Sequence, residues 1–165
     1  MKEAGAEATE ACGSDQLCAG LKAGIEGAVH AVRAMAAIRP DEEEWGFLLV
    51  DAANAFNAGN QTAILWTVRH LWPSGARFSF NCYRHWSSLM IRCDIGYDTD
   101  FLMSKEGVTQ GDPLSMILYG IGMLPLTKFL KKEIPDCIQP WYADDAGAGG
   151  SFEAIEDFPN RLVLE

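Results

Sequence analysis

Apolar and polar residues alternate along the chain in two rhythms, one typical of helices and the other typical of strands. In the helical rhythm, apolar residues recur every three or four positions, which gathers them on one face of a helix. Leu17, Leu21, Ile25 and Val29 follow this spacing near the start of the chain. The same pattern predicts helices over residues 16–35, 60–71, 74–87, 114–132 and 151–165.

Short apolar runs and turn residues predict the strands. The run Trp45–Val50 is almost uninterrupted, which is typical of a strand buried on both faces, and Asp51 follows it directly. Residues 89–95 and 101–104 flank a turn-like segment, so they predict a β-hairpin.

A second hairpin is predicted over residues 138–148, with Asp144 and Asp145 at its turn. Helices interleaved with hairpins predict an α+β domain, in which helices pack on one face of an antiparallel sheet. A chain of 165 residues is long enough for one such domain with its own core.

The domain is expected to span residues 16–165. Residues 1–15 are rich in Ala, Glu and Gly and show no apolar period, so we predict a disordered tail there. The longest apolar stretch, at 116–126, contains Gly and Pro and falls short of the roughly 20 residues of a membrane span. With no targeting signal, we expect an intracellular protein, nuclear or cytoplasmic, without a membrane partner.

Composition adds two constraints. The net charge of −10 should repel a phosphate backbone, because affinity for nucleic acid comes largely from Lys and Arg. The cysteines are odd in number and form no C-x-x-C pair, and the three histidines are isolated. We therefore expect structural histidines and free thiols, not a zinc site, at Cys12, Cys18, Cys82, Cys93 and Cys137.

Three of the 23 acidic residues have an unusual context. Asp51 ends an apolar run, while Asp144 and Asp145 are adjacent and flanked by Trp, Tyr, Ala and Gly. Like charges in such a setting repel unless a cation compensates them, and Mg²⁺ is the natural cation for carboxylate oxygens. The alternative reading of an Asp-Asp pair is a turn with solvated acids.

Three segments resemble the palm motifs of reverse transcriptases, particularly those of non-LTR (non-long-terminal-repeat) retrotransposons. Phe47–Asn57 carries an apolar run followed by D-x-x-x-A-F-N, and Glu106–Ser115 carries G-x-x-Q-G-D-P-x-S. Tyr142–Asp145 reads Tyr-Ala-Asp-Asp, the third motif of the family, and residues 16–32 resemble the helix before the first motif. The resemblance therefore covers nearly the whole chain and implies a polymerase palm-like fold.

The resemblance implies that Asp51, Asp144 and Asp145 are the catalytic, metal-binding residues, with the backbone carbonyl of Ala52 completing one coordination shell. Two Mg²⁺ ions would be the cofactors, with Mn²⁺ as a substitute, and they would activate an attacking hydroxyl and hold a leaving pyrophosphate.

The resemblance also implies a nucleotide-binding site. Phe56 would be a steric gate that excludes a ribose 2′-hydroxyl, unless it is simply a core residue. Gln110 and Gly111 would contact the incoming nucleotide and its template base, and Asn54 and Ala55 would lie near the triphosphate. The implied partners are an RNA template, a DNA primer and a deoxynucleoside triphosphate.

The family's basic fingers and its thumb have no counterpart in this sequence, so we expect them to be largely missing. This accounts for the acidic charge, because those subdomains supply most of the basic surface. It also predicts little polymerase activity from this chain alone, and self-association through uncovered apolar surface. Two alternatives stay open: a catalytically inactive remnant acting as a binding module, and the palm of an RNA-dependent RNA polymerase.

Overall fold

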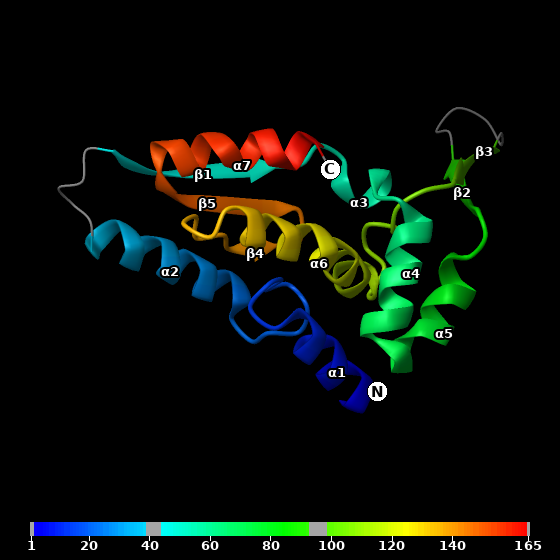
Figure 1. Cartoon of the computed structure of the whole chain (residues 1–165). Helices are drawn as coiled ribbons and strands as arrows, with labels where there is room; N and C mark the ends of the chain where they lie inside the picture. Colours follow the sequence, from blue (N-terminus) through cyan, green and yellow to red (C-terminus); the bar gives the residue numbers. More distant parts are fainter. Residues whose placement is uncertain (1, 39–43, 93–98, 165) are drawn as a thin grey trace.

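In the residues that the computed structural model describes (2–38, 44–92 and 99–164), two antiparallel sheets lie among helices (Figure 1). The strands are β1 (Trp45–Asp51), β2 (Ser87–Arg92), β3 (Thr99–Ser104), β4 (Trp141–Tyr142) and β5 (Asp145–Ser151). The larger sheet has the order β1-β5-β4, and β2 pairs with β3 in the smaller one. The helices are α1 (Lys2–Cys12), α2 (Gly24–Ile38), α3 (Ala55–Ala58), α4 (Gln61–Leu71), α5 (Pro73–Tyr83), α6 (Ser115–Glu133) and α7 (Phe152–Leu164).

One face of the larger sheet packs on α6 and α7. Ala146 and Ala148 of β5 belong to the same buried cluster as Leu130 of α6 and Phe158 of α7. The small alanine side chains let the two helices approach the sheet closely, and Phe158 fills the space between them without any exposure. The predicted α+β class, with helices on a face of an antiparallel sheet, is thereby confirmed.

The opposite face of this sheet is less well covered. Gly147 and Gly149 lie there beneath the ring of Phe47, and a Cβ atom at either glycine would come within 2.7 or 2.8 Å of that ring. Leu49 shares this face and is 78% exposed. The prediction that β1 is buried on both faces is therefore wrong, because α6 and α7 cover only one of them.

The first residues of the chain form a helix, so the prediction of a disordered tail over residues 1–15 is also wrong. In α1, Ala8 and Cys12 are each 1% exposed, and they pack in the core that surrounds α4 and α6. The indole nitrogen of Trp72 donates to the carbonyl oxygen of Ala4 at 2.7 Å, which ties α1 to the end of α4. Small apolar residues at four-residue spacing make this contact, and their weak hydrophobicity hid the pattern.

The helix predicted from residue 16 begins only at Gly24, as α2. The preceding segment follows an irregular path, with positive φ angles of +80° at Gly20 and +56° at Ala23. No residue of α2 is buried, although its apolar residues recur at helical spacing. Those residues face a cavity above the open face of the sheet, which is described below.

Most of the remaining elements agree with the predictions, but α3 was not predicted, and the turn of the second hairpin consists of Ala143 and Asp144, with Asp145 already in β5. The helices predicted over residues 60–71, 114–132 and 151–165 are confirmed as α4, α6 and α7, within a few residues at each end. The helix α5 stops at Tyr83, short of the predicted residue 87. β2 and β3 form the predicted hairpin, and the tip of its turn, at 93–98, lies outside the described residues.

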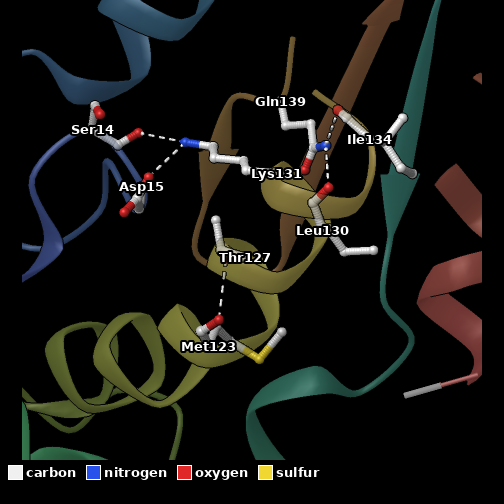
Figure 2. A network of polar contacts seen from close by, with 8 residues as sticks. All are labelled: Ser14, Asp15, Met123, Thr127, Leu130, Lys131, Ile134 and Gln139. Carbon is white, nitrogen blue, oxygen red and sulfur yellow. Dashed lines mark hydrogen bonds and ion pairs between the residues drawn. The ribbon is translucent and has the colours of Figure 1, made fainter. Parts of the chain in front are cut away.

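Polar groups, some partly exposed and one buried, join the irregular segments to α6 (Figure 2). The ammonium group of Lys131 forms an ion pair with Asp15 at 2.8 Å and donates to the carbonyl oxygen of Ser14 at 3.3 Å. The side-chain amide of Gln139 donates to the carbonyl oxygens of Leu130 and Ile134 at the end of the same helix. These contacts fix where β4 begins relative to α6.

The cysteines in the described part of the chain are free thiols, as predicted, while Cys93 falls outside the described residues. None of the helices described there is long and apolar enough to cross a membrane.

Candidate metal centre

The register of the larger sheet brings two of the predicted carboxylates together. Asp51, the last residue of β1, is the direct cross-strand partner of Asp145, the first residue of β5. Cβ atoms of directly paired residues lie about 4.5–5.5 Å apart. Asp144 precedes Asp145 in the turn from β4, so all three predicted residues lie at one end of this sheet.

The electrostatics of this group show mutual repulsion. The pKa of Asp145 is raised above its ordinary value, first by partial burial and then by the negative charges of Asp144 and Asp51. The pKa of Tyr119 is raised to about 12 by burial and, second, by the charge of Asp144. A cation bound among the carboxylates would remove this repulsion.

The donor chemistry fits Mg²⁺, which takes carboxylate and carbonyl oxygens. Ala52, whose backbone carbonyl oxygen is the additional predicted ligand, follows Asp51 directly and is exposed. The side-chain positions fit less well, because no group of three or more His, Cys, Asp or Glu residues in the described segments is arranged to hold a metal ion.

The turn that carries Asp144 is tightly fixed. Its first residue, Ala143, has a φ of +53° and is almost fully buried. The side-chain amide of Gln16 donates to the carbonyl oxygen of Ala143 at 3.0 Å and accepts from its N–H at 2.7 Å. Gln16 itself is 0% exposed. The sequence interpretation missed this role because it assigned Gln16 to the start of a helix.

Phe56 lies in the core beside Tyr119, the residue whose pKa is raised in part by the charge of Asp144. It is 6% exposed and stacks on Tyr119 of α6, with ring centroids 4.6 Å apart and planes inclined by 19°. Its neighbour Ala55 is also buried at the start of α3. This position agrees with the core reading of Phe56, and the role as a steric gate stays a prediction.

The loop before α6 is hydrogen bonded to α3, so the second of the motif segments lies against the first. The N–H of Val108 donates to the carbonyl oxygen of Phe56, and the N–H of Gly107 donates to that of Gly59, both at 2.7 Å. Gly107 has a φ of +68°, and a Cβ atom there would meet the backbone of Phe56 and Asn57. Only glycine fits this close approach.

The other predicted nucleotide-binding residues lie near this contact. Asn54 adopts a left-handed conformation with φ +55°, and its side chain accepts a hydrogen bond from Asn57 at 2.8 Å. Gln110 and Gly111 are exposed in the loop, with φ +90° at Gly111. Asp112 anchors the loop, because its carboxylate accepts from the hydroxyl of Tyr83 at 2.6 Å.

A cavity of about 620 Å³ lies between α2 and the open face of the larger sheet. Apolar residues of α2 form one wall, and Asp51 and Asp145 line the other together with Phe47 and Leu49. Arg33 of α2 also lines the cavity and brings a positive charge to it. The carboxylates therefore border a hollow large enough for a small ligand.

The fold is similar to that of telomerase. The structure of telomerase from Candida albicans in complex with a TWJ fragment of telomeric RNA matches with a TM-score of 0.68 and 11% identity, over 99% of this chain and 32% of that chain. Apo telomerase from Candida tropicalis, truncated from the C-terminal domain, matches with a TM-score of 0.65 and 14% identity, over 98% and 36%.

These likenesses support a reverse-transcriptase-like fold. Because the sequence identities are only 11% and 14%, the likenesses concern the fold alone. The chain spans about a third of the length of those two telomerase chains. No known family model matches the sequence, and no curated protein sequence matches it either.

Proposed function

We propose that this chain is a partial reverse transcriptase domain of retrotransposon origin, in which Asp51, Asp144 and Asp145 bind two Mg²⁺ ions for RNA-directed DNA synthesis. The observation that carries the proposal is the cross-strand pairing of Asp51 with Asp145 in a fold similar to that of telomerase. The three motif segments, in their order along the chain, support the assignment to non-LTR elements.

The chemistry would be transfer of a nucleotide to the 3′-hydroxyl of a DNA primer. The hydroxyl group would lose its proton, its oxygen would form a bond to the α-phosphorus of a deoxynucleoside triphosphate, and the bond from that phosphorus to the leaving pyrophosphate would break. Bound Mg²⁺ would lower the pKa of the hydroxyl and neutralise charge on the pyrophosphate. The three aspartates and the carbonyl oxygen of Ala52 would hold the ions.

The nucleotide would lie between the loop before α6 and α3. The hydrogen bonds from Gly107 and Val108 hold the loop that carries Gln110 and Gly111 against α3, the helix that follows Asn54. Phe56 would act as the gate against a 2′-hydroxyl, and its stacking on Tyr119 would hold the ring in place. An RNA template is the proposed partner, by analogy with the telomerase that was solved with telomeric RNA.

Titration with Mn²⁺ or Mg²⁺ tests the metal site directly. We expect Asp144→Asn/Asp145→Asn to bind Mn²⁺ at least ten-fold more weakly than the wild-type chain, because loss of groups that only orient metal ligands already costs roughly 10- to 100-fold in affinity. The matched control is Glu156→Gln/Asp157→Asn, which removes two adjacent exposed acids from α7 and changes the net charge equally. Equal Mn²⁺ affinity in the wild-type chain and the aspartate variant would overturn the metal-site assignment.

Primer extension on an RNA template tests the activity. We expect little or no extension from this chain alone, because charge neutralisation of the triphosphate needs several basic residues, and in the described part of the chain Arg33 is the one basic residue that lines the cavity beside Asp51 and Asp145. Supplying the basic fingers and thumb of a related reverse transcriptase in one polypeptide should increase extension. That gain should disappear in Asp144→Asn/Asp145→Asn.

A second candidate function is a catalytically inactive palm that serves as a binding module and self-associates. It is favoured by the arrangement of the acids, which do not converge on a common point, and by the exposed apolar hairpin β2–β3. The large apolar side chains exposed on that hairpin are Leu89, Met90, Ile91, Phe101, Leu102 and Met103. Light scattering of the purified chain tests self-association, which Met90→Lys/Phe101→Lys should abolish.

A further inference from the structure

The turn between β4 and β5 contains a disfavoured backbone conformation. Ala143 has a φ of +53°, a region in which the Cβ of any residue other than glycine is crowded by the backbone. Two-residue hairpin turns need a positive φ, which Gly or Asn usually provides. Since Ala143 has no side chain that could stabilise its own conformation, the support must come from another part of the chain.

Gln16 gives that support from 127 positions upstream. Its amide nitrogen donates to the carbonyl oxygen of Ala143, and its amide oxygen accepts from the N–H of the same residue. Both polar groups of Ala143 are therefore bound to one rigid planar amide. The N–H of Leu17 also donates to the carbonyl oxygen of Trp141 at 2.9 Å, which fixes this segment along β4.

The surrounding core leaves a space that fits the Gln16 side chain. Gly120 of α6 faces it, and a Cβ atom at that position would lie 3.0 Å from the Cγ of Gln16 and 2.8 Å from the Sγ of Cys18. The thiol of Cys18 donates in turn to the carbonyl oxygen of Met116 on α6. Gln16 is consequently held between α6 and the turn, with no part of its side chain exposed.

We propose that Gln16 is a positioning residue for the carboxylates: by fixing Ala143, it sets the directions in which Asp144 and Asp145 leave the turn. The turn has two residues between the paired Tyr142 and Asp145, so Asp144 is the only one besides Ala143. A fixed conformation of Ala143 therefore sets the position and direction of the backbone at Asp144. This inference rests on the proposed function, because it concerns the same metal-binding side chains.

The test compares the Mn²⁺ affinity of two glutamine variants by calorimetry. Gln16→Met keeps the length and burial of the side chain but removes both hydrogen bonds to Ala143, and it should weaken Mn²⁺ binding by roughly 10- to 100-fold, as loss of a residue that orients metal ligands does elsewhere. The control, Gln139→Met, also replaces a buried glutamine that is hydrogen bonded to backbone carbonyls, but these belong to the C-terminal end of α6 and not to the turn. It should bind Mn²⁺ as the wild type does.

Each outcome decides a different question. If Gln16→Met and the wild type bind Mn²⁺ equally, or if Gln139→Met loses as much affinity, the positioning role is overturned while the proposed metal site stands. If the wild type binds no better than Asp144→Asn/Asp145→Asn, the proposed function is overturned together with this inference. Where Gln16→Met does not fold, Gln16→Asn replaces it: the shorter amide cannot reach both groups of Ala143, and the same loss is expected.

Discussion

Replacing Asp51 by Asn should stabilise the metal-free protein, because it removes a negative charge that lies directly opposite Asp145. At about 5 Å and with the dielectric constant of water, which suits exposed groups, two like charges repel by about 0.8 kcal/mol. A domain of this size should then gain about 2–3 °C in Tm. Asp145→Asn should give a similar gain, since it removes the other member of the pair.

The pH dependence follows from the raised pKa of Asp145. A carboxyl group whose pKa is higher in the folded state than in the unfolded state binds its proton more tightly when folded. Its repulsion is therefore absent below its ordinary pKa of about 4, and it develops as the pH rises through the folded-state value. The stabilisation in Asp51→Asn should accordingly be present at pH 7 and vanish near pH 3.

Thermal unfolding followed by circular dichroism, with a chelator present, measures these differences. A double-mutant cycle isolates the pair. The gain in unfolding free energy in Asp51→Asn/Asp145→Asn should be smaller than the sum of the two single gains by about 0.8 kcal/mol, because either substitution alone already removes the repulsion. Adding Mn²⁺ should reverse the order, because the wild type gains stability by ligand binding and the variants gain less. A lower Tm for either single variant in chelator at pH 7 would refute the repulsion.

Three further changes test the fold around the site. Phe158→Ala should cost roughly 3–5 kcal/mol of unfolding free energy in chemical denaturation, because this fully buried ring leaves a cavity between α7 and the sheet; a loss below 1 kcal/mol would contradict that packing. Tyr83→Phe should cost about 1.5–3 kcal/mol, since it removes the hydrogen bond to the carboxylate of Asp112, and an unchanged midpoint would argue against the bond. Gly111→Ala should lose only about 1–2 kcal/mol from its positive φ, whereas Gly107→Ala should lose more, because its Cβ would also meet the backbone of α3; the reverse order would count against this loop geometry.

Local patterns in the sequence predicted the helices that have strong apolar periods. Helices α4 and α6 were predicted within a few residues, because their large apolar side chains recur every three or four positions and face the core. Helix α1 was missed, since its buried face consists of small residues such as Ala8 and Cys12. Its stability comes from contacts with α5 and α6, which a single segment of sequence does not reveal.

The start of α2 was misplaced for a related reason. Leu17 and Leu21 continue the helical spacing of α2, yet the backbone before Gly24 is drawn away from a helix by hydrogen bonds to β4 and to the turn after it. These bonds join residues more than a hundred positions apart. Because a helical period reports only on neighbours in sequence, it could not indicate that Gln16 belongs to the turn.

The sequence by itself determined which carboxylates stand in an apolar setting, since the composition around Asp51, Asp144 and Asp145 is local. It also determined the α+β class, through the order of helices and hairpins. Only the tertiary structure decided that Asp51 lies opposite Asp145, because strand register depends on how two distant segments pair. It likewise decided that a buried glutamine supports Ala143, because a buried polar group must find its partner wherever the folded chain brings one.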